Sequence, residues 1–155
     1  MNKIRIDDVD DGVSSASVQR SLTDPLGAEN LALNYYELAP GESFAYGYHS
    51  HESQEEVFVV LEGRVTFETE DGEVSVAAGD AIRFAPGEFQ QGINEGEQRV
   101  VAFALGAPRE SGELRLFRTC DSCGERTPAT IERADDGDTR VTVCLECGAE
   151  TGRYE

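Results

Sequence analysis

Short runs of alternating apolar and polar residues, separated by glycine and proline turns, fill residues 31–107. In one of them, Val65 and Phe67 alternate with polar residues, and Val74 continues the same inward face after the turn 71–72. Alternation with a period of two predicts strands buried on one face, and the Asp-Gly pair at the turn tolerates the positive φ of a hairpin. No amphipathic helical pattern interrupts this region. The sequence therefore predicts an all-β sandwich or barrel.

The expected strands are short and follow one another closely. Their predicted ranges are 31–36, 43–51, 57–61, 64–70, 74–76, 81–84 and 98–105.

The chain has only two histidines, His49 and His51, which lie two residues apart. If this segment is a strand, both imidazoles project from one face, whose other side chains are small. Glu56 follows after a four-residue gap that can hold a turn, and it opens the apolar run 57–61. Two imidazoles and a carboxylate converging from neighbouring strands suit a divalent transition metal with open coordination positions. The alternative is that two histidines lie on a solvated strand by chance.

An aromatic stripe made of Phe44, Tyr46 and Tyr48 occupies the opposite face of the same predicted strand. Aromatic area of this size is rarely left in water. Because aromatic residues are favoured both in cores and at subunit contacts, the stripe is expected to pack within the chain or to form a homodimer contact.

The chain carries 31 acidic and 13 basic residues, a formal net charge of −18, and Lys3 is its only lysine. This excess of carboxylate predicts a halophilic protein that stays soluble in concentrated salt. The same charge argues against nucleic acid and anionic membranes as partners, because no basic run offsets it. The longest apolar stretch, 100–105, is far shorter than the roughly 18 residues of a membrane helix. The first residues lack the apolar core of a signal peptide, so a cytoplasmic location is expected.

Two Cys-x-x-Cys-Gly knuckles lie near the C-terminus and together supply Cys120, Cys123, Cys144 and Cys147. In a cytoplasmic protein this doubled knuckle predicts one structural zinc bound by four thiolates. Strands are expected between the knuckles at 130–133 and 140–143, and the segment resembles a zinc ribbon. Its 37 residues (119–155) are too few to fold well without such a staple. Disulfides or a redox dithiol are the alternatives.

The spacing around the histidines resembles the first motif of the cupin family, which is His-x-His, three or four residues, Glu, six residues, Gly. The chain has His49-Ser50-His51, four residues, Glu56, six residues and Gly63. The leading glycine of the family motif is displaced.

The second cupin motif is Gly, five residues, Pro-x-Gly, two residues, His, three residues, Asn. The chain has Gly79, five residues, Ala85-Pro86-Gly87, two residues, Gln90, three residues and Asn94. Ala85 thus replaces the first proline of the motif, and Gln90 replaces its histidine.

This resemblance implies a double-stranded β-helix (jelly-roll) barrel with a metal inside, held by His49, His51 and Glu56. Gln90 takes the place of the fourth ligand, and its neutral amide is a weaker donor than imidazole. Three roles are open to it: it binds the metal, it holds a metal-bound water, or it leaves the position to a substrate. Iron is the expected metal of such a 2-His-1-carboxylate set, with manganese, nickel and zinc as alternatives.

The expected organisation is an N-terminal arm (1–30), a cupin barrel (31–107), a linker (108–118) and a zinc ribbon (119–155). Three functions fit this organisation. The first is a metal-dependent enzyme of oxygenase or isomerase type with a small-molecule substrate, for which no catalytic residue beyond the ligands can be assigned. The second is a non-catalytic small-molecule or metal sensor whose ribbon acts on a partner protein. The third is an interaction protein with a vestigial pocket.

Overall fold

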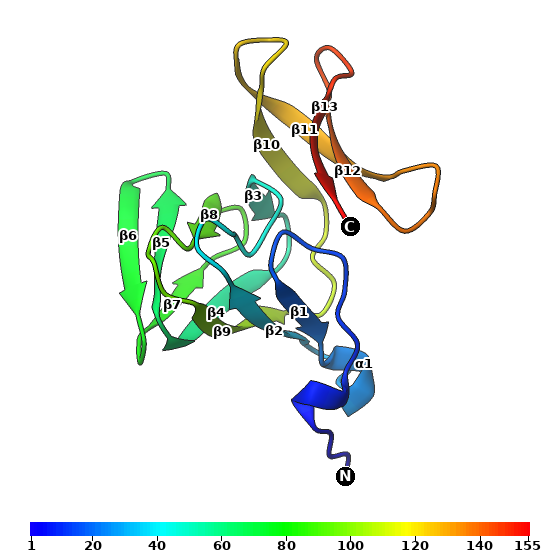
Figure 1. The fold of residues 1–155 in the computed structure, drawn as a ribbon. Helices are drawn as coiled ribbons and strands as arrows, with labels where there is room; N and C mark the ends of the chain where they lie inside the picture. Colours follow the sequence, from blue (N-terminus) through cyan, green and yellow to red (C-terminus); the bar gives the residue numbers. More distant parts are fainter.

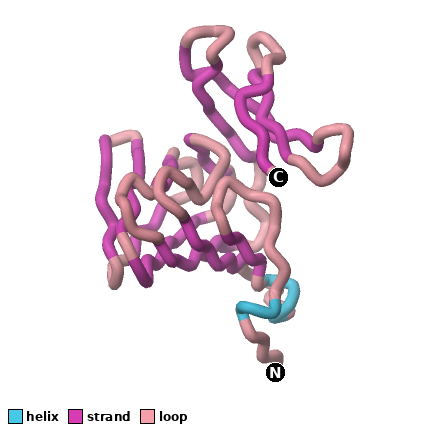
Figure 2. The backbone as a smooth tube through the Cα atoms, viewed as in Figure 1, coloured by secondary structure: helices cyan, strands magenta, loops and turns pink.

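The computed structural model describes residues 1–155. Two β-sheets face each other, and the second sheet extends into a C-terminal module (residues 114–155) that stands above them (Figure 1). Helical structure is confined to a segment near the N-terminus (Figure 2), namely the 3-10 helix η1 (Ile6–Asp8) and the four-residue α1 (Thr23–Leu26). None of the helices has the length and apolar character needed to span a membrane.

The first sheet has five antiparallel strands. In spatial order they are β1 (Val18–Ser21), β2 (Ala32–Leu38), β9 (Val100–Ala107), β4 (Glu55–Glu62) and β7 (Ala81–Phe84). The second sheet has eight antiparallel strands. In spatial order they are β13 (Glu150–Tyr154), β12 (Arg140–Cys144), β11 (Glu125–Arg133), β10 (Leu114–Cys120), β3 (Tyr48–His51), β8 (Gln90–Ile93), β5 (Arg64–Thr69) and β6 (Gly72–Ala77).

The core fills the space between the two sheets and is rich in phenylalanine. The rings of Phe44 and Phe58 lie 4.8 Å apart, and those of Phe58 and Phe67 lie 5.0 Å apart. Phe67 is fully buried, as the alternation predicts. Val74 was expected on the same inward face, but 42% of its surface is exposed. The reason is its position on β6, the edge strand of the second sheet, where no strand lies beyond it.

The segment predicted as one strand over 43–51 is a strand only from Tyr48 to His51, because residues 44–47 bend. The aromatic stripe is therefore divided among three environments. Phe44 enters the core, Tyr46 packs against Tyr154 with 4.5 Å between ring centroids, and Tyr48 stacks on Phe89 at 5.3 Å. Of the two alternatives for this stripe, packing within the chain is what the structure has, so the stripe gives no support to a homodimer.

The residues assigned to a linker (108–118) include the start of β10, which pairs with β3 over four positions, from Leu114 opposite His51 to Phe117 opposite Tyr48. Gly47 permits this approach. A Cβ atom at Gly47 would lie 2.6 Å from the carbonyl oxygen of Phe117, closer than a methyl group tolerates. The C-terminal module is thus a direct continuation of the sheet that carries the histidines.

The residues assigned to an N-terminal arm (1–30) also take part in the sheets. Strand β1 pairs with β2, and Leu22 and Thr23 are buried. The Thr23 hydroxyl accepts a hydrogen bond of 2.8 Å from the backbone N–H of Leu33. This segment therefore forms one edge of the first sheet.

Candidate metal centre

The two histidines and Glu56 meet in the interior between the sheets. His49 and His51 project from one face of β3, and Glu56 projects from β4 in the facing sheet. The Nε2 atoms of His49 and His51 lie 4.0 Å and 3.6 Å from Oε2 of Glu56. One potential ligand atom from each of the three side chains lies within 4.8 Å of the others.

The hydrogen bond of His49 fixes which ring nitrogen faces the cavity. Its Nδ1 lies 2.9 Å from the carbonyl oxygen of Gly47 and is therefore the protonated nitrogen, which leaves the Nε2 lone pair directed toward Glu56. Burial lowers the pKa of His49, an effect that the nearby Glu56 carboxylate partly opposes. A neutral imidazole is the form that a metal ion requires.

Gln90 belongs to the same group of side chains. It lies opposite His49 in the β3–β8 pairing, and its Nε2 donates a 2.9 Å hydrogen bond to Oε2 of Glu56. The same nitrogen lies 3.3 Å from Nε2 of His49, whereas Oε1 of Gln90 is buried without a partner. The two amide atoms are assigned from their hydrogen-bonding partners, and a half-turn of the amide exchanges them.

The two adjacent glutamates of β4 have different environments. Glu55 points out of the barrel and pairs with Arg83, whereas the carboxylate of Glu56 is largely buried beside the histidines. This follows from the alternation of side chains along a strand. Gly63, which ends the same motif, adopts φ of 77°, and a Cβ there would lie 2.6 Å from the carbonyl oxygen of Arg99. The last glycine of the motif therefore has a structural role.

A cavity of 330 Å³ opens beside these side chains, and nine of its 16 lining residues are hydrophobic. Tyr36 lines it from β2, and burial, together with the nearby Glu56 carboxylate, raises the pKa of this phenol well above its usual range. Tyr36 therefore faces the cavity as a neutral hydroxyl group. The only guanidinium group that lines the cavity is that of Arg109, which donates hydrogen bonds to Asp24 and to the carbonyl oxygen of Ala28.

Sequence reasoning missed several residues of this cavity. Leu114 and Leu116 come from β10, and Ile131 comes from β11 in the C-terminal module. Gln54 is buried, and its Nε2 donates a 2.8 Å hydrogen bond to the carbonyl oxygen of Pro108. The alternation of Leu114 and Leu116 was visible in the sequence, but no signal there identified β3 as the partner strand.

The distances from Glu56 to the two histidines are compatible with a single transition-metal ion. Two ligand atoms bonded to one ion at about 2.1 Å can lie at most about 4.2 Å apart. The distances from Glu56 Oε2 to the two imidazole Nε2 atoms, 3.6 Å and 4.0 Å, fall within this limit. The Gln90 amide presents its Nε2 to these atoms, and a half-turn of the amide would present the buried, unpartnered Oε1 in its place.

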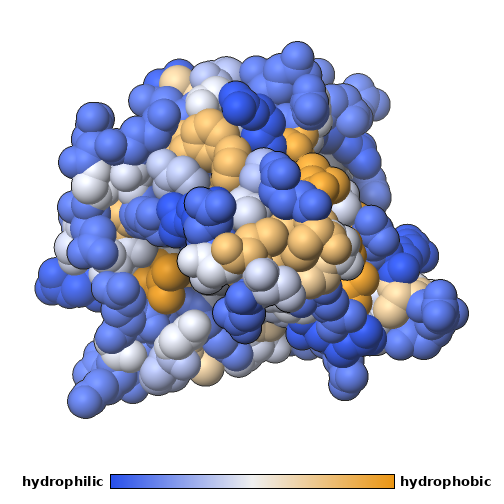
Figure 3. All heavy atoms as spheres, turned by 90° about the horizontal axis from the view of Figure 1, so that it is seen from above, coloured by the Kyte–Doolittle hydropathy of each residue, from blue (hydrophilic) through white to orange (hydrophobic).

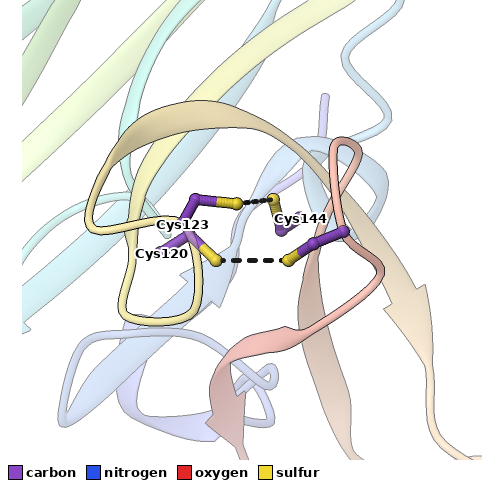
Figure 4. A group of neighbouring side chains, drawn as sticks. Cys120, Cys123 and Cys144 are labelled. Atoms are coloured by element: carbon purple, nitrogen blue, oxygen red, sulfur yellow. Dashed lines mark hydrogen bonds between the residues drawn. The ribbon is translucent and has the colours of Figure 1, made fainter.

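The four cysteines form a second cluster at the far end of the C-terminal module, where two loops face each other (Figure 4). The Sγ atoms of Cys120 and Cys147 lie 3.6 Å apart, and those of Cys123 and Cys144 lie 3.9 Å apart. Sulfur atoms bonded at about 2.3 Å to one tetrahedral zinc lie about 3.8 Å apart, whereas a disulfide requires about 2.05 Å. The sulfur spacing therefore fits a metal site.

The thiol of Cys144 is prepared for the thiolate form. A hydrogen bond of 3.1 Å joins it to the Thr127 hydroxyl, and this bond is the main cause that lowers the pKa of Cys144 to about 6. Thiolate is the form that binds zinc.

The fold and the site define a class of protein, namely a double-stranded β-helix whose interior brings together two histidines and a glutamate. Residues 34–106 match the family model of the Cupin domain. This confirms the all-β barrel that the motif spacing predicted. No curated protein sequence matches the chain.

Solved structures support the same fold. The polyketide cyclase RemF of Streptomyces resistomycificus is 26% identical, with a TM-score of 0.64 over 78% of this chain and 88% of that one. A sugar phosphate isomerase of the cupin superfamily from Silicibacter pomeroyi is 22% identical, with a TM-score of 0.61, and covers 96% of this chain and 91% of that one. A protein described as a predicted oxalate decarboxylase from Thermotoga maritima is 21% identical, with a TM-score of 0.59, over 68% of this chain and 98% of that one.

Proposed function

We propose that the cupin domain holds one divalent transition metal through His49, His51 and Glu56, with Gln90 as a fourth, weaker ligand, and acts on a small molecule as an enzyme of oxygenase or isomerase type. The convergence of three potential ligand atoms within 4.8 Å in the interior of the barrel carries this proposal. The donor set of two imidazoles and a carboxylate suits iron best, and manganese, nickel and zinc are the alternatives. The bound ion supplies Lewis acidity and open coordination positions for a chelating ligand or oxygen.

The chain's own residues position the ligand atoms and define the space for a substrate. The carbonyl oxygen of Gly47 holds His49 in the tautomer whose Nε2 faces the site. The Gln90 Nε2 donates to the Glu56 carboxylate in this structure, and Gln90 would act as the fourth ligand after a half-turn of its amide. The neutral hydroxyl of Tyr36 can donate a hydrogen bond to an oxygen atom of a ligand in the cavity, and its raised pKa keeps the proton on the phenol. The nine hydrophobic residues of the lining offer apolar contact to the rest of a ligand.

We further propose that Cys120, Cys123, Cys144 and Cys147 bind one structural zinc, so that the C-terminal module is a zinc ribbon. The sulfur separations of 3.6 Å and 3.9 Å support a tetrahedral site. In this role the zinc stabilises the two loops and takes no part in the chemistry of the barrel.

A non-catalytic sensor is the second candidate. The observation that favours it is that Ile131 of the C-terminal module lines the cavity. A bound ligand would therefore contact this module, which could in turn bind a partner protein. Oxygen consumption or isomerisation by the metal-loaded protein separates the enzyme from the sensor.

Metal content measured on protein purified without chelator tests the proposal. Two metal ions per chain are expected, and Glu56→Gln should lose the barrel metal while it keeps the zinc. Glu55→Gln is the matched control, since the neighbouring carboxylate faces outward, and it should retain both metals. Equal metal content in Glu56→Gln and Glu55→Gln would overturn the assignment.

A further inference from the structure

The C-terminal module forms part of the wall of the metal cavity. Residues that lie directly opposite each other in an antiparallel pair project from the same face of the sheet. Leu116 lies opposite His49, and Leu114 lies opposite His51, so both leucines project on the face of the two imidazoles. Leu116 also lies opposite Ala129 of β11, and Ile131 follows Ala129 on the same face.

This wall is apolar, and the same module also contacts a further lining residue. Leu114, Leu116 and Ile131 all line the cavity and carry no polar side-chain atom. Tyr46, which also lines it, is packed against Tyr154 of β13 at 4.5 Å between ring centroids. Figure 3 shows the molecule from above, where apolar residues near the centre are surrounded by a largely hydrophilic surface.

Away from the metal, the charges around the cavity disfavour a second anionic group on the ligand. The only guanidinium on its lining, that of Arg109, lies 2.7 Å from the carboxylate of Asp24. Glu56 adds a negative charge inside, and the whole chain carries a net charge of −18. A phosphoryl group would find one partly neutralised cation, whereas phosphate recognition normally uses several donors or unpaired cations.

We propose that the C-terminal module forms the part of the cavity wall that selects the ligand of the metal centre. This ligand combines a metal-chelating group of two neighbouring oxygens with an uncharged, apolar body about the size of one ring. The two oxygens would bind the metal held by His49, His51 and Glu56, and the ring would rest on Leu116 and Ile131. This inference deepens the function proposed above and depends on the metal centre.

Two hydroxamates with the same chelating group test it. Acetohydroxamate carries a methyl group and benzohydroxamate carries a phenyl ring, so their affinity ratio isolates the contribution of the apolar body. In calorimetric titrations of the metal-loaded full-length chain, benzohydroxamate should bind at least about tenfold more tightly, since it buries several additional carbon atoms. Phosphonoacetohydroxamate, with the same chelating group and a phosphonate, should bind more weakly than acetohydroxamate.

Ile131→Ser should lower the ratio of the two affinities at least about threefold and leave acetohydroxamate binding unchanged. Val74→Ser, at an exposed valine of β6 outside the cavity, is the control and should keep the wild-type ratio. If no hydroxamate binds, the metal centre itself fails, and this inference with it. If acetohydroxamate binds but the phenyl ring adds nothing, or Ile131→Ser keeps the full ratio, the wall assignment alone is overturned. Tighter binding of the phosphonate would overturn the ligand class.

Discussion

Gly47→Ala should loosen both the β3–β10 contact and the metal centre. An added Cβ would lie 2.6 Å from the carbonyl oxygen of Phe117, 2.9 Å from Cγ of Arg118 and 3.0 Å from Cδ1 of Leu116. The nearest of these atoms is backbone, so relief requires β10 to move away from β3. Overpacking of this kind costs about 1–3 kcal/mol of the free energy of unfolding. In a chain of this size each kcal/mol lowers the melting temperature by roughly 2–4 °C.

The same substitution disturbs His49, because the carbonyl oxygen of Gly47 holds its Nδ1. Loss of such a supporting hydrogen bond weakens metal binding by about tenfold or more. Thermal unfolding followed by circular dichroism measures the first effect, and competition with a chromophoric chelator measures the second.

Gly96→Ala is the matched control for Gly47→Ala. A Cβ at Gly96 meets only the side-chain oxygen of Asn94, at 3.4 Å, and neither glycine has a positive φ. Both substitutions reduce the entropy of the unfolded chain alike, by about 0.4–1 kcal/mol, so their difference reports the native contact. Equal melting temperatures and equal metal affinities of the two variants would refute the reasoning.

Three further outcomes are expected. Gln90→His should tighten metal binding, because imidazole is a better donor than an amide, and Gln90→Leu should weaken it, because leucine provides no donor. Equal metal dissociation constants for the wild type and both variants, measured by calorimetry, would remove Gln90 from the ligand set. Cys123→Ser should lose the zinc and the amide-exchange protection of β11–β13 while the β4 and β9 amides stay protected; unchanged protection in β11–β13 would count against a zinc that stabilises the module. Because the pKa of His49 is lowered in the folded state, the unfolded chain binds a proton near pH 6.5 that the folded chain does not. The metal-free protein should therefore lose stability as the pH falls below about 6.5. Urea unfolding at a series of pH values should show a smaller loss for His49→Gln than for the wild type.

The strands of the barrel could be predicted because each run combines alternation with a turn that ends it. The runs 64–70 and 81–84 became β5 and β7 with nearly the predicted bounds. The grouping of His49, His51 and Glu56 could also be predicted, since the two-residue spacing fixes the shared face and the motif spacing places the carboxylate.

The pairing partners of β3 could not be predicted in the same way. Strand β8 (Gln90–Ile93) is short and polar, and it owes its strand conformation to pairing with β3 and β5 rather than to its own residues. Strand β10 begins inside a segment whose polar start suggested a linker, and only the absence of a side chain at Gly47 allows it to reach β3. Contacts of this kind join residues that lie far apart in the sequence. A Cβ added at Gly47 would lie 3.0 Å from Cδ1 of Leu116, which is 69 positions further along the chain, and no local pattern encodes this approach.

One row of paired residues crosses four strands and connects the two candidate metal sites. His49 lies opposite Leu116, Leu116 lies opposite Ala129, and Ala129 lies opposite Cys144. Three strand spacings of about 4.8 Å separate the ends of this row by roughly 14 Å. Strand β10 lies in the middle of it and ends at Cys120, so the strand that lines the cavity beside the histidines also carries the first cysteine. A zinc ion bound to the cysteines would therefore hold β10 in the register that places Leu116 next to His49. The cysteine cluster and the cavity are for this reason parts of one sheet, and the C-terminal module contributes to the shape of the site as directly as the barrel does.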